Sequence, residues 1–301
     1  MKTEVYKQLS ELLPLAEILY DEPMSKHTTF RVGGAADVFV RIASEDQLKV
    51  LIPELVKSEI PYYIIGKGSN LLVGDKGFRG VVIQLDEAFE NIKVNNNIVT
   101  ACAGASMAKI AKTALQNSLT GFEFAAGIPG CVGGGVIMNA GAYGGEMKDV
   151  VESCCYLDEN LEIKEMNLDD MALSYRHSIF CETGYVILGV KFKLEKGDKS
   201  EITSKMSELM EKRRSKQPLE YPSAGSTFKR PESDFAGRLI EASGLKGFTC
   251  GGAQVSEKHS GFVINKGNAT CADVLGVISA VKEKVYEDSG VMLECEIRIL
   301  E

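Results

Sequence analysis

The segment from Gly127 to Gly145 mixes many glycines with apolar residues, and this composition points to ligand binding by the backbone. Glycine loses more backbone entropy on folding than any other residue, so such density weakens a regular element. It is useful where main-chain N–H groups must approach an anionic ligand closely. Flexible linkers are instead rich in serine and other polar residues. Because Ile128, Val136 and Tyr143 favour burial, the segment is predicted to be a buried cofactor-binding loop.

A second glycine-containing turn, Gly66-Lys-Gly-Ser-Asn70, lies between two predicted strands. It does not match a dinucleotide fingerprint, because Leu71 occupies the third glycine position and the chain continues as a strand rather than a helix. The turn can still hold a phosphate, since Gly66 and Gly68 permit close approach and the following polar side chains can donate hydrogen bonds. A tight turn without function is the alternative interpretation.

Ser226-Thr-Phe-Lys229 has the S-x-x-K spacing of a serine acyl-transfer nucleophile. The pattern is short and common by chance, and the S-D-N and K-T-G sequences that accompany it in acylases are missing downstream. Serine acyl transfer is therefore not favoured. The serine is notable for its setting, since a glycine precedes it and two cations follow.

Two further groups of charged residues have both a functional and a structural interpretation. Arg176 lies in the polar hexapeptide from Tyr175 to Phe180, where a lone arginine is most often a solvated loop residue. Glu294, Glu296 and Arg298 share one face of a predicted strand by its period of two. Such a face is usually a solvated edge, and a catalytic acid is the rarer interpretation.

Hydrophobic periodicity and capping residues predict the elements that position these segments, in an α+β chain. Helices are predicted at residues 5–19, 44–57 with Ser44 as N-cap, 106–117 with Ser106 as cap, 199–216, 235–242 and 271–287. Strands are predicted at 37–42, 62–65, 71–73, 80–85, 92–94, 98–103, 150–157, 161–166, 185–194, 262–265 and 293–300. The charged break at Lys196-Gly-Asp198 predicts a domain boundary, with domains at residues 1–197, divided near residue 85, and 198–301.

Composition bounds the class of protein. The chain has 301 residues, 45% of them apolar, which supports a sizeable core without crosslinks. The net charge of −8 disfavours a general nucleic-acid or membrane surface. The N-terminus lacks a signal-peptide core, and no apolar run reaches the roughly 20 residues that span a bilayer. Eight cysteines without C-x-x-C pairs and three dispersed histidines predict reduced thiols, no metal site and a cytoplasmic location.

The motifs become specific when they are taken together in chain order. They are Thr29-Phe-Arg-Val-Gly-Gly-Ala-Ala-Asp37, Gly66-Lys-Gly-Ser-Asn70, Gly127-Ile-Pro-Gly130, Asn139-Ala-Gly-Ala-Tyr143, Tyr175-Arg-His-Ser-Ile-Phe180, Ala224-Gly-Ser-Thr-Phe-Lys229 and Leu293-Glu-Cys-Glu-Ile-Arg298. In this set the chain strongly resembles the UDP-N-acetylenolpyruvoylglucosamine reductase family of bacterial peptidoglycan synthesis. The resemblance runs from about Thr28 to Arg298, nearly the whole chain.

The resemblance implies a two-subdomain FAD-binding region of the vanillyl-alcohol-oxidase type and a C-terminal α/β substrate-binding domain. It implies noncovalent FAD, with NADPH as hydride donor. The cofactor-binding residues implied are Arg31, Gly33, Gly66, Lys67, Gly68, Ser69, Asn70, Leu71, Ala126, Gly127, Pro129, Gly130, Gly134, Asn139, Gly141, Ala142, Tyr143 and Val186. The substrate-binding residues implied are Tyr175, Arg213, Lys229, Arg230, Gln254, Ser256 and His259, with Arg214 a further candidate for the diphosphate.

The reaction implied by the resemblance has two halves. Hydride passes from NADPH to FAD, and then from reduced FAD to the methylene carbon of the enolpyruvyl ether of UDP-N-acetylglucosamine. Arg176 and Glu296 match the residues that stabilise the enolate, and Ser226 matches the proton donor. The chain resembles the shorter, second type of the family, because the segment from Tyr185 to Lys199 has no room for the extra insertion of the other type.

Two other functions are compatible with parts of the sequence. An oxidase or dehydrogenase of the same flavin fold would take hydride from an alcohol or hydroxy acid instead of NADPH. A nucleotide-sugar binding module would have no redox activity, and the purified protein would be colourless. The partners expected from the resemblance are small molecules only, and a monomer is favoured.

Overall fold

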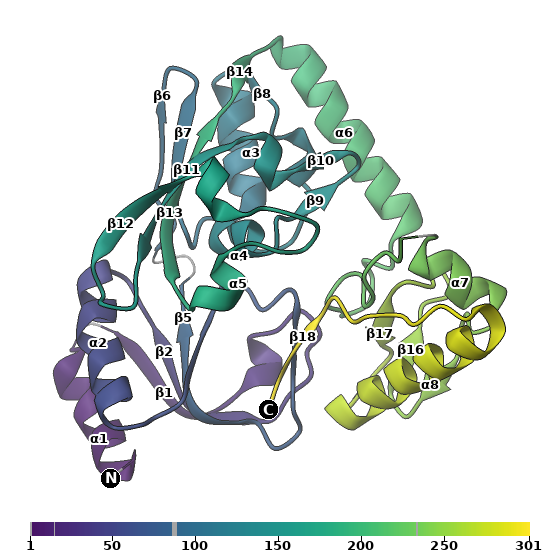
Figure 1. Cartoon of the computed structure of the whole chain (residues 1–301), viewed down its shortest axis with the longest axis horizontal. Helices are drawn as coiled ribbons and strands as arrows, with labels where there is room; N and C mark the ends of the chain where they lie inside the picture. Colours follow the sequence, from purple (N-terminus) through teal and green to yellow (C-terminus); the bar gives the residue numbers. More distant parts are fainter. Residues whose placement is uncertain (1, 15, 86–88, 233) are drawn as a thin grey trace. The chain divides into compact units, whose positions relative to one another are not determined.

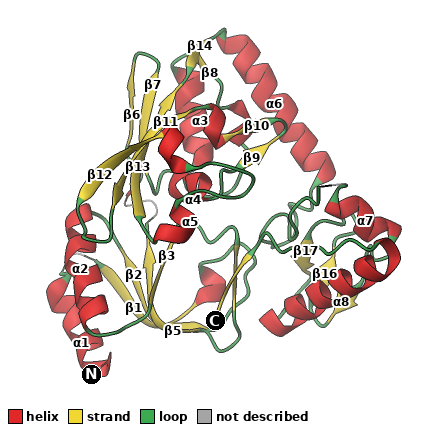
Figure 2. Cartoon of the chain, in the orientation of Figure 1, coloured by secondary structure: helices red, strands yellow, loops and turns green. Residues whose placement is uncertain are grey.

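The computed structural model describes residues 2–14, 16–85, 89–232 and 234–301, and it confirms the α+β class (Figure 2). Contacts divide the chain into two compact units. Unit 1 consists of Met1–Ile18, Val40–Lys67 and Val82–Arg213, and unit 2 consists of Leu19–Phe39, Gly68–Val81 and Arg214–Glu301. The chain passes from unit 1 to unit 2 after Arg213. The domain boundary predicted near residue 197 remains a prediction.

Unit 1 contains an antiparallel five-stranded sheet with the strand order β12-β11-β13-β7-β6 (Figure 1). Its strands are β6 (Ile92–Asn95), β7 (Ile98–Cys102), β11 (Val151–Leu157), β12 (Ile163–Asn167) and β13 (Val186–Lys193). The hairpin β6–β7 turns at Asn96, whose φ of 56° suits an asparagine. Both hairpins that the sequence predicts, β6–β7 and β11–β12, are confirmed.

Two helices contact this sheet and fix the segments between its strands. α3 (Met107–Gln116) begins at Ser106, whose hydroxyl accepts the N–H of Lys109, so the predicted N-cap is confirmed. α3 and the short helix α4 (Val132–Ile137) both contact β7, and α4 also contacts β13. The core between them includes Ile110, Val136 and Phe192, each fully buried.

The remaining described elements of unit 1 are helices, 3-10 helices and two pairs of short strands. The helices are α1 (Lys2–Leu12), α2 (Glu45–Lys57), α5 (Phe180–Thr183) and α6 (Lys199–Lys216), whose last residues belong to unit 2. The 3-10 helices are η3 (Glu123–Ala125), η4 (Met147–Asp149) and η5 (Leu168–Met171). Two-residue strands pair as β8 (Leu119–Thr120) with β14 (Glu195–Lys196), and β9 (Gly141–Ala142) with β10 (Gly145–Glu146). Ser44 caps α2 as predicted.

A four-stranded sheet has the order β1-β2-β5-β3. Its strands are β1 (Glu17–Pro23), β2 (Ala35–Arg41), β3 (Tyr62–Ile65) and β5 (Phe78–Gln84), and η1 (Met24–Lys26) follows β1. The chain changes unit inside β1, β2 and β5, so these strands contribute residues to both units.

Unit 2 has its core between a small sheet and two helices. The sheet β15-β16-β17 is formed by Thr249–Cys250, Ala253–Val255 and Val263–Asn265, and α8 (Cys271–Ser289) contacts all three strands. α7 (Ala236–Ala242) packs against α8. β4 (Leu71–Val73) pairs in parallel with β18 (Arg298–Leu300). Phe30, Leu72 and Val277 belong to the same buried cluster, so the early segments of unit 2 share one core with its C-terminal part.

Three sequence predictions are wrong, and one pair of strands was not predicted. The first helix ends at Leu12 and residues 17–19 begin β1, because Pro14 disfavours a continuing helix. The segment from Gly127 to Gly145 is not all loop, since it contains α4. The last strand is shorter than predicted, at Arg298–Leu300. The pair β15–β16 was not predicted, because two- and three-residue strands carry too little periodicity.

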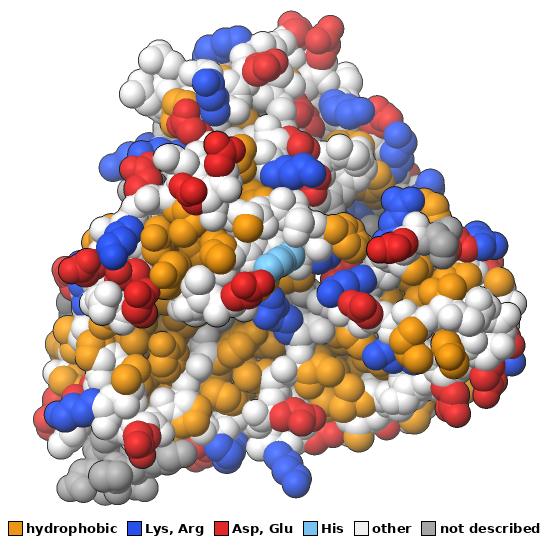
Figure 3. Space-filling view, in the orientation of Figure 1, with side chains coloured by type: hydrophobic (Ala, Val, Ile, Leu, Met, Phe, Trp, Pro, Cys, Tyr) orange, Lys and Arg blue, Asp and Glu red, His pale blue; other side chains and the backbone are white. Residues whose placement is uncertain are grey.

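The surface carries charges of both signs. Figure 3 shows acidic and basic side chains interspersed over the face in view, with apolar side chains between them. No helix in the described part of the chain combines the length and apolar character needed to cross a membrane.

Candidate active site

The glycines of α4 alternate between tightly packed and bare positions. A Cβ on Gly133 would lie 3.0 Å from the Cβ of Ala103, and one on Gly135 would lie 3.1 Å from Met147 Cε. A Cβ on Gly134 would meet nothing within 4 Å. Packing therefore explains Gly133 and Gly135, whereas Gly134 leaves its backbone uncovered. This is the arrangement expected where a ligand approaches the main chain.

The segment continues into a tight hairpin, β9–β10, that displays an aromatic side chain. Tyr143 and Gly144 are its two central residues, with φ angles of 54° and 91°. This left-handed pair is typical of a two-residue hairpin turn. A tyrosine rarely adopts this conformation, yet Tyr143 is 42% exposed, so its burial does not explain the choice. A strained, exposed aromatic residue is the pattern expected of a ligand contact.

Arg213, a predicted substrate ligand, lies against the same segment. A Cβ on Gly127 would lie 3.0 Å from Arg213 Cδ, so the absence of a side chain at Gly127 makes room for the arginine. Burial lowers the pKa of the Arg213 guanidinium, and the nearby hydroxyl of Tyr143 opposes this shift. The guanidinium still stays protonated in proteins. Within unit 1, Gly127, Tyr143 and Arg213 therefore form one cluster around a half-buried cation.

Asn139 is fully buried and bonds to three parts of unit 1. Its Nδ2 donates to Glu146 Oε2 at 2.7 Å and to the carbonyl of Ser174 at 3.1 Å. Its Oδ1 accepts the N–H of Lys148 at 3.0 Å. The amide side chain is thus used for bonds within the chain. The predicted contact of Asn139 with the cofactor would therefore use its main chain.

Arg176 occupies a tight turn whose backbone is unusual for its residue type. Ser174 and His177 exchange both backbone hydrogen bonds, at 3.1 and 3.2 Å, which makes Tyr175 and Arg176 the two central residues. Arg176 has a φ of 55°, a left-handed conformation that favours glycine. Its guanidinium carbon lies 5.1 Å from the ring centroid of Tyr175. Backbone strain of this kind is common at functional positions, which agrees with the predicted role of Arg176.

The part of the predicted phosphate turn that belongs to unit 2, Gly68–Asn70, is bound to the segment that carries Glu296. Gly68 has a φ of 58°, and a Cβ there would lie 2.2 Å from the carbonyl of His27, so no other residue fits. Asn70 Nδ2 donates to the carbonyl of Glu296 at 3.1 Å, and the N–H of Arg298 donates to the carbonyl of Asn70 at 2.9 Å. The turn and the residues before β18 therefore form one hydrogen-bonded ribbon.

The segment with Ser226 pairs with the other side of this ribbon. The N–H of Glu296 donates to the carbonyl of Thr227, and the N–H of Lys229 donates to the carbonyl of Glu294, both at 2.8 Å. Thr227 is fully buried, and its Oγ1 accepts the N–H of Val263 at 2.9 Å. Ser226 and Glu296 are thus fixed on neighbouring extended segments, and both are partly exposed.

The other predicted residues of this region have partners within unit 2. Lys229 pairs with Glu294 at 3.2 Å, both exposed, which is worth little in stability. Gln254 Nε2 donates to the carbonyl of Gly247 at 3.2 Å. Ser256 Oγ accepts two N–H groups of the turn that contains His259. The two bonds of Ser256 shape the turn between β16 and β17.

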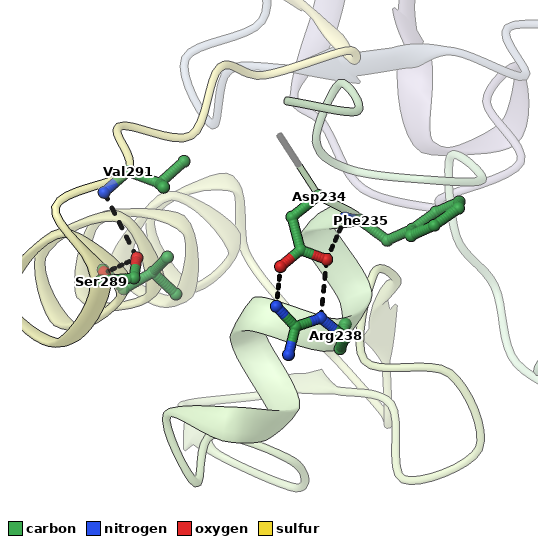
Figure 4. Close-up of polar contacts among 6 residues, drawn as sticks. Asp234, Phe235, Arg238, Ser289 and Val291 are labelled. Atoms are coloured by element: carbon green, nitrogen blue, oxygen red, sulfur yellow. Dashed lines mark hydrogen bonds and ion pairs between the residues drawn. The ribbon is translucent and has the colours of Figure 1, made fainter. Parts of the chain in front are cut away.

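Arg230 stacks on an exposed aromatic ring beside a bidentate ion pair. Its guanidinium carbon lies 4.1 Å from the ring centroid of Phe235, which is 57% exposed. Figure 4 shows that the Asp234 carboxylate accepts the N–H of Phe235 and two bonds from Arg238. The carboxylate therefore fixes the start of α7 and with it the ring on which Arg230 lies.

The remaining predicted cofactor residues lie at turns and strand starts. Gly33 has a φ of 129°, and a Cβ there would lie 2.7 Å from Val73 Cβ; Arg31 has a φ of 55°. Leu71 and Val186 are the buried first residues of β4 and β13. The rest lie in loops or at element ends: Gly66, Lys67 and Ser69 next to β3 and β4, Ala126, Pro129 and Gly130 before α4, and Gly141 and Ala142 in β9.

Gln84 was not predicted as a site residue from the sequence, and it lies beside the predicted phosphate turn Gly66–Asn70. It is 5% exposed, and its Nε2 donates to the carbonyl of Gly66 at 3.0 Å. Its Oε1 is buried and has no hydrogen-bond partner among the described residues. A buried acceptor without a donor is costly. The one signal for it in the sequence is a polar residue inside the apolar strand Phe78–Gln84.

These observations fit a dinucleotide-sized cofactor such as FAD, which carries both phosphates and hydrogen-bond donors. Bare glycine backbone at Gly134 and the strained, exposed Tyr143 are features that it would use. The predicted FAD-binding residues occur in both compact units, and so do the predicted catalytic residues: Arg176 is in unit 1, while Ser226 and Glu296 are in unit 2. That the three converge on one substrate stays a prediction.

Comparisons with known proteins define the class first. A family model described as an FAD binding domain matches residues 36–166. A solved structure of Phl p 4.0202, a glucose dehydrogenase, has a TM-score of 0.50 at 13% identity, covering 65% of this chain and 44% of that chain, which is a likeness of fold alone. The protein is therefore an FAD-binding flavoprotein, and its fold resembles that of this dehydrogenase.

The family follows from the C-terminal part and from full-length relatives. A second model, UDP-N-acetylenolpyruvoylglucosamine reductase C-terminal domain, matches residues 217–300. Reductases of that name from Alkaliphilus oremlandii and Clostridioides difficile are 50% and 48% identical, each covering 99% of this chain and 98% of the relative. The solved reductase of Thermus caldophilus has a TM-score of 0.80 at 32% identity, covering 95% of this chain and 99% of that chain. The chain belongs to the UDP-N-acetylenolpyruvoylglucosamine reductase family of FAD-dependent enzymes.

Proposed function

We propose that this chain reduces UDP-N-acetylenolpyruvoylglucosamine to UDP-N-acetylmuramate with NADPH, and that Arg176, Ser226 and Glu296 carry the second half-reaction. The observation that carries this assignment is the ribbon in unit 2. The backbone of Glu296 is held on one side by Thr227, next to Ser226, and on the other by Asn70 of the phosphate turn. A proton donor, an acid and a cofactor segment thus share one rigid hydrogen-bonded frame.

FAD, when bound, supplies the carrier that takes hydride from NADPH and passes it to the enolpyruvyl group. The segments that would hold it are Gly66–Leu71, Gly127–Gly134 and Gly141–Tyr143. These segments offer bare backbone and few mobile side chains. Each segment is therefore organised before the cofactor arrives, which lowers the entropy lost on binding.

Arg176 and Glu296 stabilise the charge that develops when hydride reaches the methylene carbon. That charge spreads into the substrate carboxylate as an enolate, and the groups that stabilise it must be in place beforehand. The planar fork of Arg176 suits two carboxylate oxygens. Glu296 contributes as a neutral acid or through a bridging water, because an ionised carboxylate would repel the enolate.

Ser226 gives a proton to the carbon that bears the ether oxygen. A serine hydroxyl is a weak acid, so it acts on a strongly basic, carbanion-like centre. The basic residues Arg213, Lys229 and Arg230 bind the uridine diphosphate, with Tyr175, Gln254, Ser256 and His259 around the sugar. Each of these contacts is a proposal.

Further features of the proposal concern the protein in the cell. It works as a cytoplasmic monomer on small-molecule substrates, without nucleic acid or membrane, and its FAD-binding region ends near residue 197. It is of the shorter type in the family. Acidic and basic side chains are mixed on the face shown in Figure 3, which argues against a surface there that binds nucleic acid or an anionic membrane.

The test separates the two half-reactions by stopped-flow absorbance of the flavin. Ser226→Ala should leave reduction by NADPH within about twofold of wild type and slow reoxidation by the enolpyruvyl substrate by roughly 10² to 10⁴, the usual worth of a positioned proton donor. Ser223→Ala is the matched control, because the described bond of Ser223 uses only its carbonyl. Equal loss in both half-reactions would rule out the proton-donor role.

A further inference from the structure

The turn that presents Arg176 is held at both ends by the glycine-rich segment. On its N-terminal side, Asn139 Nδ2 donates to the carbonyl of Ser174. On its C-terminal side, Ser178 Oγ donates to the carbonyl of Ile137 at 2.8 Å. All four residues are in unit 1. Two positions at the end of α4 thus bond to the residues that flank the turn.

These bonds are buried and have little freedom to rearrange. Asn139 and Ser178 are both fully buried. The carbonyl of Ile137 is at the C-terminus of α4, where helix carbonyls lack partners within the helix. It accepts from Ser178 and also from Cys181 Sγ at 3.3 Å, a weaker donor. Ser178 is therefore the strong link between α4 and the segment after the turn.

The turn needs such support because its conformation is strained. Arg176 at a φ of 55° costs free energy that the surrounding structure must supply. The bonds of its neighbours fix both ends of the turn, and so they place the backbone that carries the guanidinium. A displacement of about 1 Å at a catalytic group is enough to slow a reaction by about 10²-fold.

We infer that Ser178 and Asn139 are positioning residues, which hold the Arg176 turn on the end of α4 and so tie the enolate-stabilising guanidinium to the glycine-rich segment. This inference rests on the proposed role of Arg176. It also gives the buried side chain of Asn139 a use other than direct cofactor binding. Neither bond follows from sequence spacing, because each joins positions about 35 to 41 residues apart.

The experiment compares Ser178→Ala with Ser178→Cys in the stopped-flow assay, on holoenzyme with measured FAD content. Reoxidation by the enolpyruvyl substrate should slow about 10- to 100-fold in Ser178→Ala and less in Ser178→Cys, whose thiol is a weaker donor of similar shape. Flavin content and reduction by NADPH should stay within about twofold of wild type. Thr183→Val is the control, since it removes a hydroxyl of the same segment that bonds only to the carbonyl of Ile179 and the N–H of Tyr185.

A double-mutant cycle separates positioning from general damage. If Ser178 acts through Arg176, then Ser178→Ala added to Arg176→Ala should slow reoxidation by less than a further twofold. Additive effects in the cycle, an unchanged reoxidation rate, or equal loss in both half-reactions would overturn the inference. An Arg176→Ala variant that reoxidises at the wild-type rate would instead overturn the proposed role of Arg176 itself.

Discussion

Single residues in the site carry conformations that their types do not favour. Arg31, Tyr143 and Arg176 all have left-handed backbone, with φ of 54° or 55°. The motifs alone assign all three to the site. Such strain persists where the surrounding structure determines it, and it gathers at binding and catalytic positions.

Gly68 also has left-handed backbone, and there the surrounding atoms leave room for glycine alone. Gly68→Ala adds a Cβ at 2.2 Å from the His27 carbonyl and imposes a left-handed alanine. We expect a loss of at least about 2 kcal/mol in the free energy of unfolding and weaker FAD binding. Urea denaturation and flavin fluorescence titration measure the two effects.

The control is Gly290→Ala, where φ is 71° but the added Cβ meets nothing within 4 Å. It should cost about 1 kcal/mol from backbone strain alone. Equal costs at the two glycines would mean that the contact with His27 has no effect.

His259 gives unit 2 a pH-dependent stability. Burial lowers the pKa of its imidazole from the ordinary value of 6.5, and its Nδ1 accepts the N–H of Gly261 at 3.1 Å. The unfolded chain therefore binds a proton more readily than the folded one, so stability falls as pH drops from 6.5 toward the lowered pKa. His259→Asn, which keeps an acceptor but does not titrate, should flatten this dependence in denaturation curves recorded across that range. A slope as steep in the variant as in the wild type would assign it to other groups.

At the scale of elements, capping explains which helices the sequence predicts well. Ser44 and Ser106 cap their helices, as expected from their positions before apolar periodic segments. α4 could not be predicted, because a helix with three adjacent glycines forms only through packing of Gly133 and Gly135 on residues distant in the sequence. Leu293–Ile297 alternates like a strand but bonds as an irregular ribbon to Thr227–Lys229 and Asn70.

α8 depends on a cap from outside its own segment. Asp75 Oδ1 and Oδ2 accept the N–H groups of Cys271 and Ala272 at 2.7 and 2.9 Å, in addition to the capping box of Thr270 and Asp273. Asp75→Ala leaves those amides unsatisfied and removes a negative charge from the helix N-terminus. We expect it to cost about 1–2 kcal/mol in urea denaturation. Lys76→Ala, at the neighbouring exposed position, should change stability by less than about 0.5 kcal/mol, and a similar cost in both variants would argue against the cap.

At the scale of the whole molecule, the ordered motifs were enough to predict the family, the cofactor and the class of reaction. They could not reveal Gln84, Ser178 or the internal use of Asn139, because these depend on contacts between segments far apart in the chain. A lone buried glutamine in an apolar strand acquires meaning only when its oxygen is seen to lack a donor. Sequence patterns identify residues that are chemically special, whereas supporting residues look ordinary until the fold is known.

The central claim is that one flavin carries hydride from NADPH to an enolpyruvyl ether bound by this chain. The most direct measurement is anaerobic stopped-flow absorbance of the holoenzyme, mixed first with NADPH and then with UDP-N-acetylenolpyruvoylglucosamine. The account predicts that the visible flavin band is lost with NADPH and returns with the second substrate, with one product molecule carrying two more hydrogens per flavin reoxidised. A flavin that NADPH does not bleach but an alcohol or hydroxy acid does, or a protein that stays colourless with added FAD, would contradict it.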